Sequence, residues 1–439
     1  MKTDRAAISF RSFGSLAYDK SRNHQSLLTS HFSPITSHIY MVRPRLLTIL
    51  CYGAMMSLAI GVNLLPIFLT SFSASFGGAN GLSQEQLGRL GAFSFAGGVF
   101  GILLAGPLAD RWGAKVFALA GNAVMTASLV GMSMAPDYWA LSIAVFWLGF
   151  GAGVLDMVLS PVVSVLNPER RSAAINWLHS FYCVGAVVTI LASTVALQVG
   201  VGWRNAALLL LPLPVVLLVT FGFLHFPELV HESEEAGRSP MRELLREPWL
   251  WGCLIAIFLG GATELGMAQW LPAYAETSLG FPKWIGGAAL LAFSVLMAAG
   301  RMVVGSIGTR VNPFVVLAWC CGSSVLLFLL GSFLTVPGWA LTACIVVGFT
   351  GSALWPTVLA VSADRYPAGG ATMFAALAAM GNAGGIFMPW IVGWIGDLVN
   401  LHWGLAVSTL APLLMLPLVL ILKRTQATSA TSFAEMARE

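Results

Sequence analysis

The chain has 439 residues, of which 57% are hydrophobic and only 10% are charged. Soluble globular domains carry about 25% charged residues, so this composition excludes a protein whose whole surface faces water. The formal net charge of +4 is small and gives no reason to expect a nucleic-acid partner.

The apolar residues form long continuous runs rather than alternating patterns. A run of about 20 apolar residues is long enough to cross a bilayer as a helix, and a helix satisfies its own backbone hydrogen bonds in lipid. Strands of a membrane barrel would alternate in polarity. We therefore expect an all-α polytopic membrane protein with twelve transmembrane helices in two pseudo-symmetric six-helix halves.

Residues 1–40 differ from the rest, because they are rich in serine, histidine and charge and contain no apolar run. They do not resemble a signal peptide, since no hydrophobic core closely follows the basic residues. Met41 is followed by Val-Arg-Pro-Arg and then by the first apolar run. We expect residues 1–40 to be a disordered N-terminal extension or an over-extended gene start.

Twelve apolar spans follow, in two groups of six separated by a polar central loop at 227–248. The second part of this loop, Pro240–Pro248, is compatible with a short amphipathic helix on the membrane surface. A polar tail at 424–439 ends the chain. The spans of the N-terminal half (41–226) cover about 46–72, 87–108, 115–135, 138–165, 174–199 and 205–225, and those of the C-terminal half (249–423) about 249–275, 284–307, 313–335, 338–362, 371–396 and 402–422.

The cysteines share one feature, which is that each lies inside an apolar run. None has metal-ligand spacing, and a disulfide framework is not expected at such positions. We expect packing residues, and neither a metal site nor a cofactor. They are Cys51, Cys183, Cys253, Cys320, Cys321 and Cys344.

The distribution of basic residues predicts the orientation. With both termini in the cytoplasm, the inside segments of the core hold fourteen arginines and lysines, whereas the outside segments hold only Arg89, Arg204 and Lys283. Cytoplasmic loops carry an excess of these residues. We therefore expect a multi-pass protein of the cell (inner) membrane, with cytoplasmic termini, central loop and tail.

The two halves repeat each other at an offset of 199 residues. Repeated halves are typical of transporters that bind substrate near the membrane midplane between them. Chance matching of glycines in apolar sequence is the alternative. The offset aligns Gly101 with Gly300, Gly106 with Gly305, Arg111 with Arg310, Gly149-Phe150 with Gly348-Phe349 and Gly185 with Gly384, and a slightly different offset aligns Asn63–Pro66 with Gln269–Pro272.

The most specific motif joins the second and third spans and predicts a water-facing hairpin. It runs Gly106-Pro107-Leu108-Ala109-Asp110-Arg111-Trp112-Gly113-Ala114-Lys115. The pattern G-x-L-A-D-R-x-G-x-K resembles the signature loop of major facilitator superfamily transporters, and the general resemblance covers about residues 41–425. A generic polar turn with positive-inside charges is the alternative.

This resemblance implies a gate on the cytoplasmic side, in which the aspartate and its basic neighbours form a charge lock that opens and closes during transport. We assign two groups of residues to the gate. They are Gly106, Asp110, Arg111, Gly113 and Lys115 of the motif, and Arg301 and Arg310 of the second half.

Two acidic residues, Asp156 and Glu264, remain in the membrane interior once loops and span ends are removed. An acidic side chain there costs about 2.5–3.5 kcal/mol on insertion scales and usually faces a cavity or a partner. Small residues at 149–153 let a neighbouring helix approach Asp156 closely. We expect both carboxylates to couple proton movement to substrate movement. A structural carboxylate bonded to a neighbouring helix is the alternative.

Several polar and aromatic residues are candidates for binding substrate. Asn176 and His179 lie one turn apart on one helix face, and a histidine there can bind substrate or relay a proton. Gln269 and Trp270 can offer an amide and an aromatic ring to a sugar. The other candidates are Asn63, Trp355 beside the kink-forming Pro356, and Asn382. All of them can equally be packing residues, and Tyr274 is expected in the interfacial aromatic belt.

Three runs narrow the resemblance to the fucose/glucose–proton symporter branch of the superfamily. They are the run containing Asp156, the run Leu178-His179-x-Phe181-x-x-Gly185-Ala186, and the run Gly300-Arg301-x-x-x-Gly305-x-x-x-x-Arg310. This resemblance implies that Asp156 occupies the position of the branch's helix-four carboxylate, which takes part in coupling. The chain departs from fucose permeases in the first span, where they carry an acidic residue and this chain offers Asn63.

The expected function is therefore secondary active transport of a small polar solute, by alternating access with proton coupling. Sugars are the leading class of expected solute. A proton-driven efflux pump for amphipathic compounds is the alternative, since 17 Met and 26 Phe residues suit an adaptable apolar cavity. We expect no enzyme, because the sequence shows no nucleophile constellation, metal-ligand cluster or phosphate loop. A sensor protein that no longer transports a solute is a third possible class of function. The expected partners are the solute, protons and lipid, and the resemblance implies a monomer.

Overall fold

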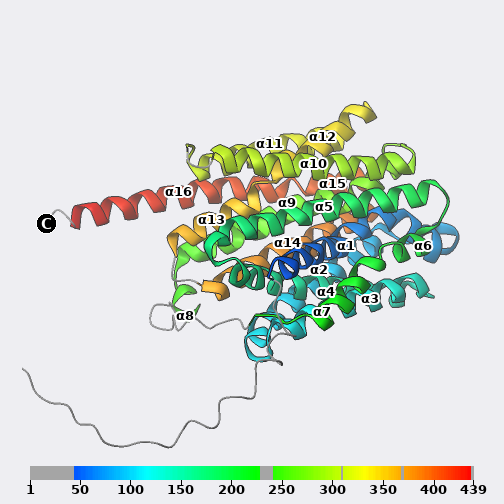
Figure 1. Ribbon diagram of the computed structural model, residues 1–439. Coiled ribbons are helices and arrows are strands. Elements are labelled where there is room, and N and C mark those ends of the chain that lie inside the picture. Colours follow the sequence, from blue (N-terminus) through cyan, green and yellow to red (C-terminus); the bar gives the residue numbers. More distant parts are fainter. Residues whose placement is uncertain (1–43, 228–240, 308–309, 367–369, 437–439) are drawn as a thin grey trace, which may run out of the picture. The chain divides into compact units, whose positions relative to one another are not determined.

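The computed structural model describes residues 44–227, 241–307, 310–366 and 370–436, and every regular element in these ranges is helical. Twelve of the segments are long and apolar enough to cross a membrane, which confirms the predicted all-α class. Figure 1 shows them running side by side. The predicted N-terminal extension (1–40) and most of the predicted central loop lie outside the described residues.

Six spans form each half. The N-terminal half comprises α1 (Pro44–Phe76), α2 (Gln84–Trp112), α3 (Ala114–Met134), α4 (Tyr138–Leu166), α5 (Arg171–Gln198), and the pair α6 (Trp203–Leu208) and α7 (Pro212–Phe223). After the short α8 (Met241–Leu244), the C-terminal half comprises α9 (Pro248–Thr277), α10 (Lys283–Ile307), α11 (Pro313–Phe333), the pair α12 (Pro337–Gly351) and α13 (Leu354–Arg365), α14 (Gly370–Leu398), and the pair α15 (Leu401–Val407) and α16 (Leu410–Met436).

Three predicted spans are each interrupted into two helices. In the sixth span, α7 begins at Pro212, whose ring nitrogen has no hydrogen to donate to the preceding turn. In the tenth, the predicted kink lies just before α13, which holds Pro356 in its first turn. The last helix, α16, continues to Met436, well beyond the predicted end of the twelfth span.

The predicted hairpin at 106–115 is almost entirely helical. Helix α2 continues to Trp112, helix α3 begins at Ala114, and Gly113 alone joins them. Its φ of 83° lies in a region that glycine adopts without a steric penalty, so the chain reverses in one residue. The prediction was wrong in extent because charged residues in a last helical turn can reach water without a loop.

The alternating directions of the helices define two ends of the bundle. The proximal end carries the start of α1, Gly113, and the end of α16, and the distal end carries the connections 77–83, 135–137, 199–202 and 278–282. In Figure 1, α8 and the end of α16 mark the proximal end on the left, and α6 marks the distal end on the right.

Glycines let α2 and α4 touch backbone to backbone. A Cβ atom on Gly149 would lie 1.9 Å from the carbonyl oxygen of Ser94, and a Cβ atom on Gly101 would lie 2.4 Å from that of Phe150. Both distances are far below van der Waals contact. In lipid, such close packing of small residues is a main source of helix association, so these contacts fix the position of α4.

The second half makes the same contacts between α10 and α12. A Cβ atom on Gly348 would lie 2.4 Å from the carbonyl oxygen of Phe293, and one on Gly300 would lie 2.7 Å from that of Phe349. All four residues lie 199 positions after their counterparts in α2 and α4. The offset found in the sequence therefore corresponds to equivalent helix contacts in the two halves.

A carboxylate of the second half caps a helix of the first half at the distal end. The backbone N–H groups of Gln84 and Glu85, in the first turn of α2, donate to the two carboxylate oxygens of Asp397 in α14, each at 2.7 Å. Trp390 of α14 also donates to Glu85 Oε1, at 2.6 Å. A carboxylate at a helix N-terminus satisfies unpaired N–H groups and the helix dipole, so this contact clasps the two halves.

Two further hydrogen bonds join the halves through α1 and α9. Thr70 donates to Glu276 at 2.8 Å, and the Gln269 amide donates to the carbonyl oxygen of Val62 at 3.4 Å. These five hydrogen bonds between the two halves lie in the distal part of the bundle.

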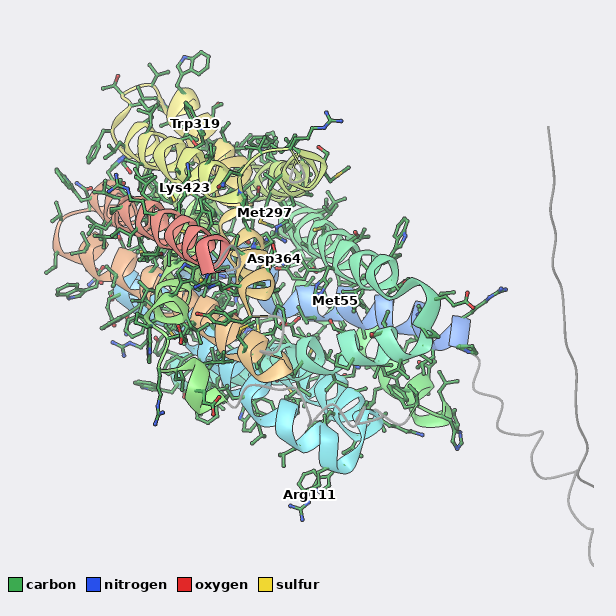
Figure 2. All side chains as sticks on the ribbon, turned by 90° about the vertical axis from the view of Figure 1, so that its left-hand side faces the viewer. Met55, Arg111, Met297, Trp319, Asp364 and Lys423 are labelled. Carbon is green, nitrogen blue, oxygen red and sulfur yellow. The ribbon has the colours of Figure 1, made fainter. Side chains whose placement is uncertain are left out.

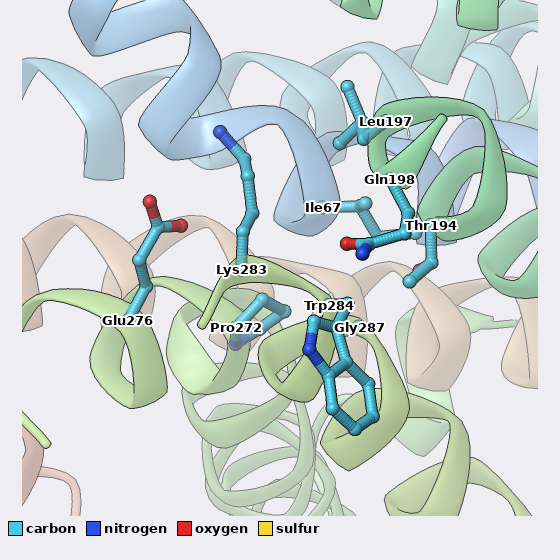
Figure 3. Close-up of a pocket in the computed structure, with 9 residues that line it drawn as sticks. All are labelled: Ile67, Thr194, Leu197, Gln198, Pro272, Glu276, Lys283, Trp284 and Gly287. Atoms are coloured by element: carbon cyan, nitrogen blue, oxygen red, sulfur yellow. The ribbon is translucent and has the colours of Figure 1, made fainter. Parts of the chain in front are cut away.

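A small pocket between α1, α5, α9 and α10 lies at the same end. Figure 3 shows Glu276 and Lys283 on one side of it and Thr194 and Gln198 on the other. Helices α5 and α10 meet here, because a Cβ atom on Gly287 would lie 2.1 Å from Thr194 Oγ1. The halves are therefore in close contact at the distal end.

We expect Gly149→Ala and Gly348→Ala each to lower the melting temperature of the purified protein by several degrees. The added methyl group must push a neighbouring backbone away, and overpacking of this kind costs about 1–3 kcal/mol. Gly322→Ala is the matched control, since nothing lies within 4 Å of its Cβ position. Equal melting temperatures for all three variants would contradict the packing described here.

Asp397→Ala should separate the distal ends of α2 and α14. Spin labels at Asn80 and Val399, in a background without the native cysteines, would measure the separation, and we expect a longer and broader distance distribution. Asp137→Ala is the control, because Asp137 caps α4 within its own half, at 2.9 Å from the Ala140 nitrogen. An unchanged distribution in Asp397→Ala would show that this cap does not hold the halves together.

Candidate functional site

Asp156 lies in the middle of α4 at the boundary between the halves. Its half-buried side chain and Asn382 of α14 line a cavity of about 50 Å³, which has room for a few water molecules. Two of the glycines that bring α2 and α4 together, Gly149 and Gly153, form part of the cavity wall. Asp156 therefore borders a cavity that residues of both halves line.

His179 of α5 is a neighbour of Asp156, and the charges of the two side chains interact. His179 also interacts electrostatically with Arg301 of α10. Its side chain is nevertheless exposed. Since its charged neighbours come from both halves, we infer that this exposed surface borders space between them rather than lipid.

Glu264 of α9 and Arg301 of α10 form an ion pair in the membrane-spanning region. Arg301 Nη2 donates to Glu264 Oε1 at 3.2 Å and to Oε2 at 3.3 Å, and Arg301 Nε donates to the carbonyl oxygen of Ser352 at 3.3 Å. Single charges in lipid are costly, and pairing reduces this cost. The side chain of Arg301 is 34% exposed, against 12% for Glu264.

Tyr182 contacts the first helix near this pair, and the sequence analysis missed it. Asn63 donates to the hydroxyl oxygen of Tyr182 at 3.5 Å and to the carbonyl oxygen of Ala59 at 2.9 Å. The tyrosine also interacts electrostatically with Glu264. Its spacing from His179, three positions earlier on α5, places both on one helix face and was the signal available in the sequence.

Of the predicted amide and aromatic pair, only Gln269 presents an unpaired polar atom. It is 3% exposed, and its Oε1 atom is buried with no hydrogen-bond partner among the described residues. Trp270 is 1% exposed, and its Nε1 donates to the carbonyl oxygen of Pro389 at 2.8 Å. In this conformation Trp270 joins α9 to α14 and does not face a cavity.

Tyr274 does not belong to an interfacial aromatic belt, so that expectation was wrong. It is 0% exposed, its hydroxyl donates to the carbonyl oxygen of Gly331 at 2.8 Å, and it lies 2.8 Å from His402 Nδ1. Polar partners inside the C-terminal half, which the linear sequence does not reveal, hold it there.

The remaining candidate binding residues lie on α13, α14 and α5. Asn382 faces the cavity beside Asp156, although its amide also donates to the carbonyl oxygen of Ala378 at 2.9 Å. The ring of Trp355 packs on Gly381, where a Cβ atom would lie 2.5 Å from ring carbons. The side chain of Asn176 is outside the described part of the structure.

The predicted gate residues of the motif lie at the proximal end. Arg111 is exposed there, in the last turn of α2, and in Figure 2 it is well separated from Asp364 and Lys423 of the second half. Lys115 donates to the carbonyl oxygen of Gly222 at 2.9 Å, a contact within its own half. Gly106 lies in α2 and Gly113 forms the turn, while the Asp110 side chain is not among those described.

The two gate arginines predicted in the second half lie apart. Arg310 is exposed in the proximal connection after α10. Arg301 lies within α10, next to Glu264. No group of three or more His, Cys, Asp or Glu side chains among the described residues is placed to hold a metal ion.

Comparisons with known proteins agree with this architecture. The chain is 24% identical over 342 residues to a probable nitrate/nitrite transporter of Mycobacterium tuberculosis, covering 75% of this chain and 84% of that protein. The crystal structure of the E. coli fucose:proton symporter matches with a TM-score of 0.60 at 18% identity, covering 86% of this chain and 99% of that one. A D-xylose-proton symporter matches with a TM-score of 0.66 at 15% identity, covering 84% and 97%.

The sequence model of the Major Facilitator Superfamily matches residues 45–375. This match spans most of the chain, and the twelve helices, the two repeated halves and the structural neighbours agree with it. The chain belongs to the Major Facilitator Superfamily of transporters.

Proposed function

We propose that this protein is a secondary active transporter that moves a small polar solute together with protons. Sugars are the leading class of candidate solute. The observation that carries the proposal is the placement of Asp156 at a cavity that residues of both halves line, with His179 close enough to interact with its charge. Ionisable side chains are rare within a membrane and often mark proton pathways. Two structural neighbours named as sugar–proton symporters share the fold and support the choice of solute.

In the proposed mechanism the site is reached alternately from each end. The distal contacts of Asp397 and Glu276 hold that end closed in the conformation described. A proton on Asp156 removes its negative charge. This lowers the free-energy cost of enclosing the side chain among apolar helices while the site changes its accessible end. Loss of the proton at the other end restores the attraction to His179 and resets the cycle.

The proposal also assigns the ends of the bundle to the two sides of the membrane. The excess of arginine and lysine in the proximal segments supports a cytoplasmic proximal end in the inner membrane. Asp110, Arg111 and Lys115, together with Arg310, then form the cytoplasmic gate. A single chain contains both halves of the site, and we propose that it works as a monomer.

A proton-driven efflux pump for amphipathic compounds is the alternative function. Apolar side chains, Phe95 and Ile102 among them, share the wall of the cavity with Asp156. The relative named as a nitrate/nitrite transporter shows that small polar solutes other than sugars are also to be tested. The polar groups around the site favour a polar solute over an amphipathic one.

Proteoliposomes containing the full chain would test the function directly. We expect one solute from a panel of hexoses, pentoses and their sugar acids to make the outside solution more alkaline, because symport carries protons inwards with the solute. Amphipathic dyes form the contrast set, and protein-free vesicles are the blank. A proton signal with dyes alone would replace symport by the efflux alternative, and silence from both sets would contradict the proposal.

Asp156→Asn should abolish uphill accumulation of the solute yet leave exchange of labelled for unlabelled solute intact. The amide cannot release a proton, whereas exchange needs no net proton movement. Asp137→Asn, at the start of the same helix but outside the site, should accumulate solute as the unchanged protein does. Normal uphill accumulation by Asp156→Asn would remove this carboxylate from the mechanism.

A further inference from the structure

We propose that Arg301 binds a carboxylate group of the substrate and that Glu264 controls access to it. The substrate is then a small hydroxylated carboxylate, such as a sugar acid, rather than a neutral sugar. This inference rests on the proposed function, since it names the substrate class of the same site. It also gives Arg301 a binding role in place of the gating role expected from the sequence.

The guanidinium group of Arg301 keeps donors available. It has five N–H bonds, and its acceptors among the described residues are the Glu264 carboxylate, the Ser352 carbonyl oxygen and the sulfur of Met297. Among the described residues, none accepts a hydrogen bond from Nη1. The side chain is nearly three times as exposed as that of Glu264 (34% against 12%). One edge of the planar group therefore borders open space and fits the two oxygens of a carboxylate.

The geometry of the Glu264–Arg301 ion pair allows a substrate carboxylate to replace Glu264 as the partner of Arg301. Its N–O distances of 3.2 and 3.3 Å are longer than the 2.7–2.9 Å that is typical of charge-assisted hydrogen bonds. Both oxygens of Glu264 bond to the same nitrogen, so the pair lacks the two parallel bonds of an ideal fork. A substrate carboxylate on the exposed edge can make that fork.

Charge balance couples this binding to a proton. With Glu264 ionised, the pair is neutral, and a bound carboxylate would leave one negative charge in the membrane interior. When Glu264 takes up a proton from water, the charge of Arg301 is left for the substrate, and the site stays neutral. The proton remains on a Glu264 oxygen during transport and returns to water after the substrate has left. No covalent bond to the substrate forms or breaks.

Other ionisable groups surround the pair of Glu264 and Arg301. His179, Tyr182 and Cys183 of α5 interact electrostatically with Arg301, and Tyr182 and Cys183 also interact with Glu264. Asp156 of α4 faces His179. None of these is a fixed second cation, so Arg301 is the permanent positive charge at the site among the described residues.

The amide side chains of Gln269 and Asn63 offer hydrogen-bonding groups for the hydroxyl groups of such a substrate. Gln269 Oε1, on the same helix as Glu264, is a buried acceptor without a partner among the described residues. Asn63 is linked to Tyr182, whose hydroxyl contacts it at 3.5 Å. We therefore assign the carboxylate of the substrate to Arg301 and its hydroxyl groups to Gln269 and Asn63.

Direct binding to the purified full chain tests the inference. The probes are pairs that differ by one carboxylate: glucose with glucuronate, and galactose with galacturonate. We expect the acid of one pair to bind about tenfold or more tightly than its neutral partner at pH 5.5, since hydrogen bonds to charged groups are the stronger ones. The acids stay ionised throughout, so their binding should weaken towards pH 8 as Glu264 loses its proton.

Two variants separate the roles of the pair. Glu264→Gln should bind the acid with an affinity that no longer changes between pH 5.5 and 8, whereas Arg301→Gln should lose the preference for the acid. Arg301→Lys, which keeps the charge but not the planar fork, should recover only part of it. Because Arg301→Gln leaves Glu264 unpaired and can unfold, the double variant Glu264→Gln/Arg301→Gln gives the same readout without a buried charge.

Preferential binding of the neutral sugar, or an acid preference that survives Arg301→Gln or the double variant, would overturn this inference. Such a result leaves the proposed function standing if the neutral sugar still drives proton movement in vesicles. Conversely, Arg301-dependent binding of the acid without any proton movement would support the binding site and overturn proton coupling. Absence of binding by every probe would count against both.

Discussion

The structure depends on backbone contacts that only glycine permits. Gly149 against Ser94 and its repeat, Gly348 against Phe293, hold α4 and α12 so closely to their partners that no side chain fits between them. In lipid, where apolar burial gives little driving force between helices, such packing is a main source of association. Because the contacts recur in both halves, each half can move as a unit. The polar groups then lie where the two units meet.

The charged groups of the interior follow from this arrangement. Asp156 and His179 come from the first half, and Glu264 and Arg301 from the second, so their separation depends on how the halves are placed. The clasp of Asp397 on the start of α2 holds the distal end. A change in charge at the centre can therefore alter the balance between contacts at the two ends, which is the physical basis of the proposed coupling.

The sequence predicted the fold well, and it named several of the polar residues that the structure places in the membrane interior, whose roles stay predictions. Apolar runs and glycine spacing revealed the helices and the repeat, because both depend on local chemistry and on lipid as the solvent. The one-residue turn at Gly113 and the pairing of Glu264 with Arg301 were missed. The first depends on a single backbone angle, and the second on helices α9 and α10 lying side by side. Trp270 and Gln269 are adjacent in sequence, and only the fold shows that they have different surroundings.

The central claim is that solute movement and proton movement are one process, and its most direct measurement is accumulation against an imposed pH gradient. Proteoliposomes are loaded at a neutral pH, diluted into acidic buffer, and followed with the labelled solute that the protein binds. The account predicts a solute concentration inside above that outside, which grows with the gradient and collapses when a protonophore is added. Equal concentrations on both sides, whatever the gradient, would contradict it.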